Sequence, residues 1–413
     1  MPDNTADTPA IAGGDPAKKT AWGQEKRYGE EELHELKEAL DQGSLFYAHG
    51  GKVRKLEEEL ARKAGARYGI ASSSGTTGIH AALIALGVSP GDEVILPPIT
   101  DMGSAIPILF QGAVPVFADV HPNSYTILPE AVEAAITPRT RAVLAVHLWG
   151  NACDMNALRS ICDRHSVALV EDCAQAMGCL YDGKLVGTVG DIGCFSFNEF
   201  KHIACGDGGV AVTNDENLAK RLRLATDKCY NREERAAIRE PVFLANNYRM
   251  TELQGAVGLS QLRKIDGIAR RRRTWCGNLS MRLGSLDGVS LPEPTAGCEP
   301  SWWFYMMRVD KERLGADVDT FAKAVSAEGL PIGAHYIGKC IYEYPIFTEH
   351  SAFERGYHPY CDYTYGKGLC PTAEAVLDTC ARLHVHQVYT DTDLEETAHG
   401  ITRVVRWFNS RRK

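Results

Sequence analysis

Two side chains able to do chemistry stand in one glycine-rich stretch of the chain. An apolar run at 167–170 leads to Asp172, and Lys201 follows in a loop flanked by Gly206 and later glycines. The run predicts a buried parallel strand, and open α/β sheets bind ligands beyond the carboxyl ends of such strands. Together the two groups suit pyridoxal phosphate, which needs an amine for its Schiff base and an anion that keeps its ring nitrogen protonated.

Each group also has a plainer interpretation. An aspartate at a strand end often caps the turn that follows, and a lysine in a glycine-rich loop usually faces solvent. Taken alone, Asp172 and Lys201 leave both interpretations open.

A second feature is the segment SSSGTT at 72–77, between a strand predicted over 67–71 and a helix predicted over 78–86. A Ser/Gly/Thr turn at a helix N-terminus presents free backbone N–H groups to an anion, and the helix dipole adds to the attraction. This predicts a phosphate cup around Gly75 and Thr76. The alternative is simple N-capping by a serine or threonine hydroxyl.

The motifs EDCAQAMG, GDIGCFSF and GDGG occur in this order, with Lys201 five residues after Ser196. In this order they resemble the sugar and cyclitol aminotransferases of the DegT/DnrJ/EryC1/StrS family. The resemblance implies a fold-type I, pyridoxal-phosphate-dependent enzyme of the α/β class. It assigns the Schiff-base lysine to Lys201 and the partner of the ring nitrogen to Asp172. It also assigns Gln175 to the ring's phenolic oxygen.

The same resemblance implies residues for the phosphate and for the partner subunit. Ser196 matches a phosphate-binding serine, and the cup at Gly75 and Thr76 matches the family's phosphate site. Asn247, in the segment NNYR, matches an asparagine that reaches the phosphate of the neighbouring subunit's cofactor. This implies a homodimer with shared active sites. From the sequence alone, Asn247 belongs to a turn before a helix predicted over 251–265.

The family pattern is broken after Thr100. Relatives usually carry an aromatic residue there that stacks on the cofactor ring, whereas this chain has Asp101 and Met102. Either the polarizable Met102 side chain takes over the stacking, or Asp101 contacts the substrate. We also expect His335 and Tyr336 on the substrate side.

Alternating strands and helices continue from residue 67 to residue 213, which predicts a mostly parallel sheet covered on both faces. We predict a flexible N-terminal arm at 1–22, a large cofactor-binding domain at 23–265 and a smaller C-terminal α+β domain at 266–413. In the arm, Pro, Gly, Asp and Ala occur without periodicity. After residue 266, a Pro/Gly linker and an aromatic-rich strand change the pattern.

The net charge and the cysteine content argue against several classes of function. The net charge of −8 argues against nucleic-acid binding, and we interpret the basic run Arg270–Arg273 as a solvated helix face. The thirteen cysteines show no CxxC spacing, so we expect no metal site and free thiols in the cytoplasm. No signal peptide is expected, and no apolar run approaches the ~20 residues that span a membrane.

We therefore expect an aminotransferase that moves nitrogen from glutamate or glutamine to a keto sugar, nucleotide-linked keto sugar or keto cyclitol. The resemblance implies a natural-product or cell-surface sugar pathway. One alternative is a sugar dehydratase, but in those relatives a histidine replaces the lysine, and here His202 follows a retained Lys201. The other is a non-catalytic regulatory relative, which would not need Asp172, Gln175, Ser196 and Lys201 together.

Overall fold

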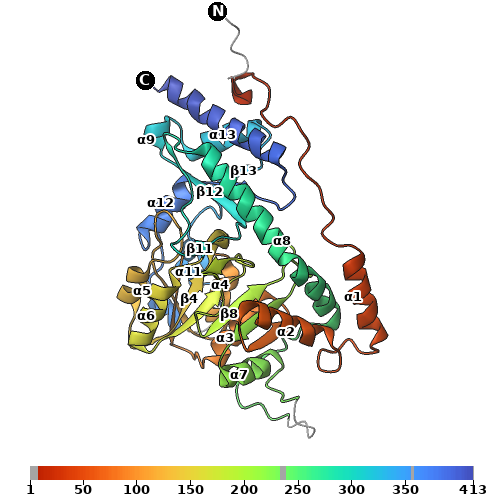
Figure 1. Ribbon diagram of the computed structural model, residues 1–413. Helices are drawn as coiled ribbons and strands as arrows, with labels where there is room; N and C mark the ends of the chain where they lie inside the picture. The colour runs from red at the N-terminus through yellow and green to blue at the C-terminus, as the bar shows by residue number, and fades with distance from the viewer. Residues whose placement is uncertain (1–7, 233–238, 355–357, 413) are drawn as a thin grey trace, which may run out of the picture.

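A seven-stranded sheet lies at the centre of the computed structural model, which describes residues 8–232, 239–354 and 358–412 (Figure 1). Strand β9 runs antiparallel to both of its neighbours, and the other neighbouring pairs are parallel. The mostly parallel α/β sheet is thus confirmed. In spatial order the strands are β1 (Tyr68–Ser72), β9 (Gly209–Thr213), β8 (Ile192–Ser196), β5 (Ala168–Asp172), β4 (Thr140–Val146), β2 (Glu93–Leu96) and β3 (Val114–Phe117).

Helices cover both faces of this sheet, because successive strand residues point in opposite directions and each face is apolar. On β4, Ala142 and Leu144 join one apolar core, and Val143 and Ala145 join the other. The first core is covered by α3 (Gly75–Ala85), α4 (Met102–Phe110) and α7 (Glu216–Thr226), and the second by α2 (Lys52–Ala64), α5 (Pro129–Ala135), α6 (Met155–His165) and α8 (Glu252–Leu283).

A smaller antiparallel sheet follows α8 in the chain, in the region that we predicted as an α+β C-terminal domain. Its strands, in spatial order, are β10 (Val289–Ser290), β12 (Phe304–Val309), β14 (Cys380–His384) and β13 (Ile332–Ala334). The helices of this part are α9 (Lys311–Leu314), α10 (Val318–Ala327), α11 (Pro345–Thr348), α12 (Pro371–Thr379) and α13 (Asp391–Arg411). A third, three-stranded sheet joins β6 (Leu180–Tyr181) and β7 (Lys184–Leu185) to β11 (Cys298–Glu299).

Helix α8 is longer than predicted. It continues from Glu252 to Leu283, across the position where we divided the chain, and links the two larger sheets (Figure 1). The interpretation of 270–273 as a solvated face is wrong for Arg272, which is 4% exposed. Its guanidinium donates to Gln387 Oε1 and to the carbonyl of Trp302, and burial lowers its pKa to about 10.

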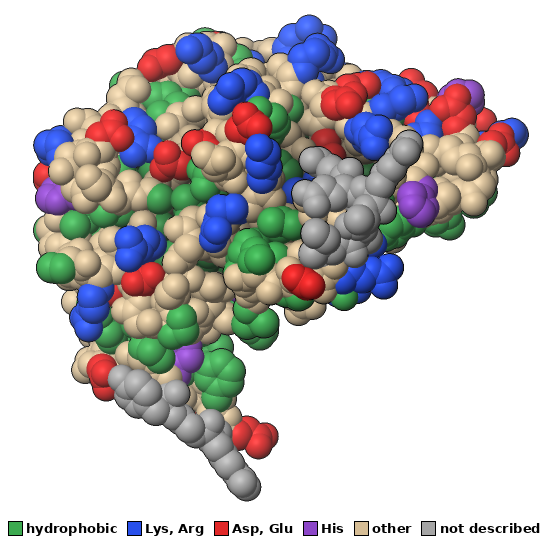
Figure 2. Space-filling model, turned by 90° about the horizontal axis from the view of Figure 1, so that it is seen from below, with side chains coloured by type: hydrophobic (Ala, Val, Ile, Leu, Met, Phe, Trp, Pro, Cys, Tyr) green, Lys and Arg blue, Asp and Glu red, His purple; other side chains and the backbone are tan. Residues whose placement is uncertain are grey.

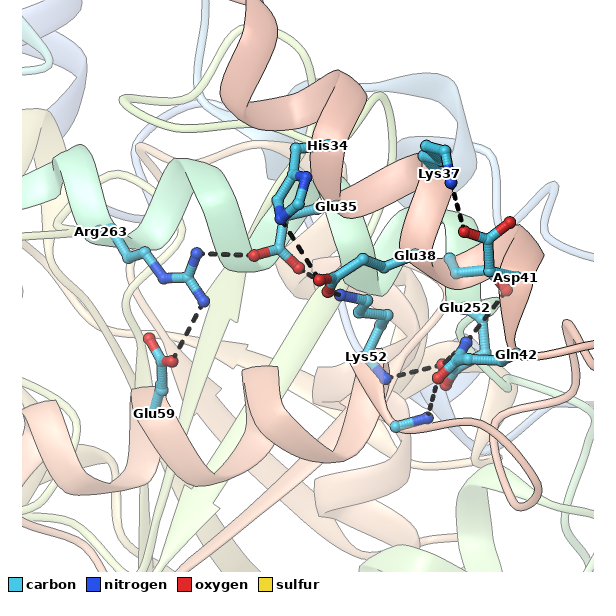
Figure 3. Close-up of polar contacts among 12 residues, drawn as sticks. His34, Glu35, Lys37, Glu38, Asp41, Gln42, Lys52, Glu59, Glu252 and Arg263 are labelled. Atoms are coloured by element: carbon cyan, nitrogen blue, oxygen red, sulfur yellow. Dashed lines mark hydrogen bonds and ion pairs between the residues drawn. The ribbon is translucent and has the colours of Figure 1, made fainter.

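Helix α1 (Glu30–Asp41) carries leucines at helical spacing, but it buries Glu32 and Glu35 and exposes Leu33 and Leu40. Leu33 and Leu40 are 59% and 61% exposed, whereas Glu35 is buried between Lys52 and Arg263. Figure 3 shows these side chains converging from α1, α2 and α8. The ion pairs compensate for the desolvation of Glu35. With the acidic side of α1 turned inward, Leu33 and Leu40 form an apolar stripe on its outer side.

The N-terminal segment from residue 8 to residue 22 lies against the C-terminal domain, although we expected a flexible arm at 1–22. The backbone N–H groups of Ala10 and Ala17 donate to the carboxylate of buried Glu328. The Lys18 ammonium pairs with Asp393 and Glu396 on α13 at 2.8 and 2.7 Å. The first seven residues of the predicted arm lie outside the described part.

On the face shown in Figure 2, Lys and Arg side chains are interspersed with Asp and Glu and do not form one basic patch. Hydrophobic side chains reach the surface between them. Among the described residues, no helix combines the length and the apolar character needed to cross a membrane.

Candidate active site

A cavity of about 290 Å³ lies beyond the carboxyl ends of the central strands. Strand β5 ends at Asp172, strand β8 ends at Ser196, and α3 begins just after β1, so these elements deliver their side chains to the same edge of the sheet. Of the residues that the sequence predicts for the site, the cavity wall includes Gly75, Thr76, Asp101, Asp172, Gln175, Ser196 and Lys201. The topology thus brings together groups that lie far apart in the sequence.

Asp172 is the buried acid of the cavity, at 4% exposure. Its Oδ2 accepts a hydrogen bond from the Ser104 hydroxyl at 2.7 Å, and its Oδ1 accepts one from the Ala174 N–H at 3.0 Å. Burial raises its pKa, and these two donors and the charge of Lys201 offset the rise only in part. A buried carboxylate with few donors favours a nearby cation.

Lys201 presents its amine to the same cavity. The Nζ atom lies 4.1 Å from the centre of the Trp303 ring, and among the described residues it forms no hydrogen bond or ion pair. Burial lowers its pKa, against the opposing charges of Asp172 and Asp101. A lysine with a lowered pKa supplies a free amine more readily near neutral pH.

The backbone around Lys201 is fixed more tightly than its amine. The Arg27 guanidinium donates to the carbonyl of Lys201 at 3.0 Å and also to that of Glu199, and the Trp303 indole N–H donates to the carbonyl of Phe200 at 2.9 Å. Three successive carbonyls are therefore held from outside the loop. The roles of Arg27, Trp303 and Ser104 are not predicted from the sequence, because each acts across a large sequence separation that no local motif signals.

The turn before α3 both caps the helix and faces the cavity. The Ser74 hydroxyl accepts from the Thr77 N–H at 3.1 Å, so the capping alternative is present. The N–H groups of Gly75 and Thr76 are in the first turn, where a helix has no internal acceptor for them. A Cβ added to Gly75 would lie 2.8 Å from the Ser196 Cβ, so only glycine leaves the backbone open here. Capping and anion binding thus coexist in this turn.

Gln175 lies between the cavity and Tyr336. Its Oε1 accepts from the Trp149 N–H at 2.9 Å, and its Nε2 donates to the Tyr336 hydroxyl at 3.2 Å. Tyr336 is therefore one contact from the cavity wall, and burial raises the pKa of its hydroxyl. Its neighbour His335 lies apart from the cavity wall, with its ring nitrogens 3.0 Å from the Leu377 carbonyl and 3.1 Å from Asp319.

The departure after Thr100 has a structural explanation. Asp101 is the N-cap of α4, where its Oδ1 accepts from the Gly103 N–H at 2.8 Å, and it lines the cavity. Met102 packs against the apolar core and is not part of the cavity wall, so the geometry does not support a stacking role for it. The aromatic ring near Lys201 is instead that of Trp303.

Asn247 is exposed and is not among the residues that line the cavity of its own chain. Its backbone forms an isolated bridge with Asp227, and its Oδ1 accepts from the Arg249 N–H at 3.4 Å. Asn247 therefore lies in an antiparallel bridge, rather than in the regular turn that the sequence predicts. An exposed amide is also free to contact a second chain.

Two buried histidines near the cavity form hydrogen bonds within the protein. The His202 Nε2 lies 3.0 Å from the Ser301 carbonyl, and burial holds the pKa of the ring well below its usual value. His147, Glu171 and Cys173 place ligand atoms within 4.8 Å of one another, as a metal site would. However, His147 and three backbone N–H groups already occupy the Glu171 carboxylate.

Comparisons with known proteins agree with this geometry. The model of the DegT/DnrJ/EryC1/StrS aminotransferase family matches residues 26–402. The chain is 31% identical to the spore coat polysaccharide biosynthesis protein SpsC of Bacillus subtilis (strain 168), over 92% of this chain and 95% of that protein. The crystal structure of 3-amino-5-hydroxybenzoic acid synthase superposes with a TM-score of 0.82 at 30% identity, over 95% of this chain and all of the other. That of DesI in the presence of its TDP-sugar product superposes with a TM-score of 0.80 at 27% identity, over 98% and 97%. The chain therefore belongs to the DegT/DnrJ/EryC1/StrS aminotransferase family and has the fold type I of pyridoxal-phosphate-dependent aminotransferases.

Proposed function

We propose that this aminotransferase uses pyridoxal phosphate to move an amino group from glutamate or glutamine to a keto sugar, nucleotide-linked keto sugar or keto cyclitol. The supporting observation is one cavity that combines buried Asp172, the amine of Lys201 and the N-terminus of α3. The similarity to DesI, whose crystal structure was determined in the presence of its TDP-sugar product, supports a sugar acceptor. We further propose a cytoplasmic location, because the thirteen cysteines are free thiols.

The residues of the cavity fit the parts of this cofactor. The N–H groups of Gly75 and Thr76 and the hydroxyl of Ser196 suit a phosphate, since they are uncharged donors at the positive end of a helix dipole. Asp172 suits a protonated ring nitrogen. Burial raises the pKa of this carboxyl, and a neighbouring cation would compensate for the loss of solvation of its charged form. When bound, the cofactor supplies an electron sink for the carbon that loses or gains a proton.

Lys201 and Asp172 then have separate tasks. The lowered pKa of Lys201 provides an amine that joins the cofactor and, when the donor displaces it, takes up and returns a proton. Asp172 holds a positive charge in a site with little water, where such an interaction is stronger than in bulk solvent. Asp101, at the cavity wall, is our candidate for a contact with the acceptor.

A homodimer with shared sites belongs to the same proposal. The outward stripe of α1 continues into a hollow of about 430 Å³ lined by Tyr28, Leu33, Leu36, Val257 and Cys205. Nearby Phe200, next to Lys201, is 79% exposed. Contiguous apolar surface of this kind marks an interaction site, and a second copy would cover the loop that carries Lys201. Asn247 would then contact the cofactor of the partner.

The direct test begins with the purified protein and pyridoxal phosphate. Borohydride should fix the cofactor on the peptide that contains Lys201, and a Lys201→Ala variant should retain none after denaturation. Glutamate or glutamine labelled with ¹⁵N in the transferable group is then offered with free and nucleotide-linked keto sugars and keto cyclitols. Labelled amine in the product supports the proposal, and failure to attach the cofactor to Lys201 contradicts it.

The two alternatives give different outcomes in the same assay. A dehydratase would release a deoxygenated product without labelled nitrogen. A regulatory relative would bind the ligand without turnover. For the shared site, Asn247→Ala should weaken cofactor retention while the fold is kept, and a fully active monomer would contradict it.

A further inference from the structure

Two thiols lie face to face outside the cavity. The Sγ atoms of Cys179 and Cys298 are 3.5 Å apart, at the junction of β6 and β11 in the three-stranded sheet. Cys298 pairs with Tyr181 in the antiparallel register, and Cys179 directly precedes β6. The backbone ladder therefore holds the two sulfurs next to each other, although 119 positions separate them in the sequence.

The two sulfurs differ in access and in hydrogen bonding. Cys179 is fully buried, whereas Cys298 is half-buried. The Cys298 sulfur accepts a hydrogen bond from the Ala152 N–H at 3.2 Å and faces the Cys179 thiol. The Cys179 thiol, acting as donor, lowers the pKa of Cys298, and the Ala152 N–H and the Arg273 charge act in the same direction. Burial raises the pKa of Cys179 well above its usual value.

Arg273 on α8 completes this environment. Its guanidinium donates to the carbonyl of Gly178 and to that of Glu299, each at 3.2 Å, so it bridges the residues adjacent to the two cysteines. It also pairs with the Glu299 carboxylate at 3.1 Å. A half-buried thiol with an N–H donor and a cation beside it is the reactive kind of cysteine, and a buried neighbour is positioned to resolve it.

We propose that Cys179 and Cys298 form a reversible oxidation site, which closes to an intramolecular disulfide when the enzyme meets hydrogen peroxide or a small-molecule disulfide. With peroxide, the Cys298 thiolate attacks one oxygen, the O–O bond breaks, and a sulfenic acid and hydroxide form. The Cys179 sulfur then attacks the Cys298 sulfur, the S–O bond breaks, and water leaves with the Cys179 proton. The sulfurs lose two electrons in total, peroxide gains them, and a dithiol such as dithiothreitol reverses the step.

The cross-link would tie together two segments that serve the cavity. Cys179 follows Gln175 by four residues, and Cys298 precedes Trp303 by five, in a segment whose Ser301 N–H donates to the Gly150 carbonyl at 2.9 Å. The proposal does not rest on the proposed function, because it concerns thiols outside the cavity wall. All thirteen cysteines are free thiols in this structure, so the link between Cys179 and Cys298 would form only on oxidation.

The test treats the reduced full-length protein with hydrogen peroxide or with oxidised glutathione, blocks the remaining thiols and maps the peptides by mass spectrometry. We expect one dominant linked pair, Cys179 with Cys298, that dithiothreitol removes. Alkylation of Cys298 should be about fivefold or more faster than that of Cys361, another half-buried cysteine. Closing the long loop should also raise the Tm by several degrees.

Three variants make the result decisive. Cys179→Ala should leave Cys298 with a glutathione or sulfenic adduct, Cys298→Ser should abolish both the adduct and the link, and Cys361→Ser should change neither. If Cys298→Ser fails to fold, the alkylation rates of the wild type still test the reactivity difference. A scrambled mixture of linked peptides, or equal alkylation of Cys298 and Cys361, would overturn the proposal.

Discussion

Two neighbouring acids on β5, Glu171 and Asp172, are both buried, but they differ in how many hydrogen bonds their carboxylates accept. Glu171 is 0% exposed, and its oxygens accept hydrogen bonds from His147 and from the N–H groups of Gly187, Val189 and Gly190. Asp172 accepts only from Ser104 and Ala174. Burial alone would raise both pKa values. The four donors lower that of Glu171, and the two donors leave that of Asp172 raised.

The difference in hydrogen bonding indicates that Glu171 stabilises the fold, whereas Asp172 is available to bind a ligand. Glu171 is satisfied by a loop that wraps around it, so its charge is stable without any other molecule. Asp172, which lines the cavity, accepts only two hydrogen bonds, and the Lys201 amine has no hydrogen-bond or ion-pair partner among the described residues. Perturbed groups in a cavity mark functional sites more often than satisfied ones do.

The largest expected effect on activity is that of Asp172→Asn. The amide keeps the shape but removes the negative charge, so the ring nitrogen of the cofactor would lose its anionic partner. We expect kcat to fall by at least about a hundredfold, which corresponds to roughly 3 kcal/mol of barrier. Stopped-flow mixing of the cofactor-loaded enzyme with the donor alone measures this step.

Attachment of the cofactor is the matched control for this variant. Borohydride should still fix the cofactor on Lys201, because the amine and the phosphate cup are unchanged. A near-normal rate of the donor reaction would mean that Asp172 only caps the turn at Ala174.

The matching change at the neighbouring position should act on stability instead. Glu171→Gln places an amide nitrogen among backbone N–H donors, and breaking such a buried pair costs about 3 kcal/mol of unfolding free energy. Urea unfolding measures the loss. The folded fraction should retain most of its activity, and a large fall in kcat with unchanged stability would reverse the roles of the two acids.

The pH dependence of stability should have opposite signs for the two acids. The folded pKa of Glu171 is lowered from 4.5, so its stabilisation is present above that value and is lost as the pH falls through the folded pKa. The folded pKa of Asp172 is raised from 3.8, so the folded state becomes less stable as the pH rises through the window above 3.8. At neutral pH, apo Asp172→Asn should therefore unfold at a higher Tm than the wild type, and apo Glu171→Gln at a lower one. Both differences should shrink toward pH 3, and a common sign would contradict the comparison.

Which features of the fold and the site could be predicted from the sequence depends on how far apart the interacting residues lie along the chain. The apolar run before Asp172 and the turn before α3 predicted their elements, because strand ends and helix starts carry local signals. The donors that distinguish Glu171 from Asp172 are not local: Ser104 is 68 residues from Asp172. The leucines of α1 recur at helical spacing in the sequence, but which side of the helix is buried depends on ion pairs with α2 and α8.

A smaller effect on activity is expected when Asp172 loses one of its two donors. Ser104→Ala removes the hydroxyl that binds Oδ2, and a net hydrogen bond to a charged group is worth about 1.5 kcal/mol, or roughly tenfold in rate. The acidic limb of the pH–rate profile should also move upward, because the pKa of Asp172 rises further. Ser104→Thr, which keeps a hydroxyl, should restore both values, and a loss of rate without a shift in the profile would indicate a packing effect.

The smallest effect concerns the loop that carries Lys201, in which contacts from Arg27 and Trp303 hold the backbone carbonyls of residues 199–201. Arg27→Gln removes the donors to the carbonyls of Glu199 and Lys201, while the Trp303 indole still holds Phe200. Because one of the two attachments remains, we expect only a two- to fivefold fall in kcat, roughly 0.4–1 kcal/mol, with little change in KM. Hydrogen exchange of the 198–206 peptide should become faster in Arg27→Gln and remain slow in Tyr28→Phe, which removes only the contact with the Glu199 side chain. Unchanged exchange in Arg27→Gln would mean that Trp303 alone fixes the loop, and that Arg27 is a surface contact.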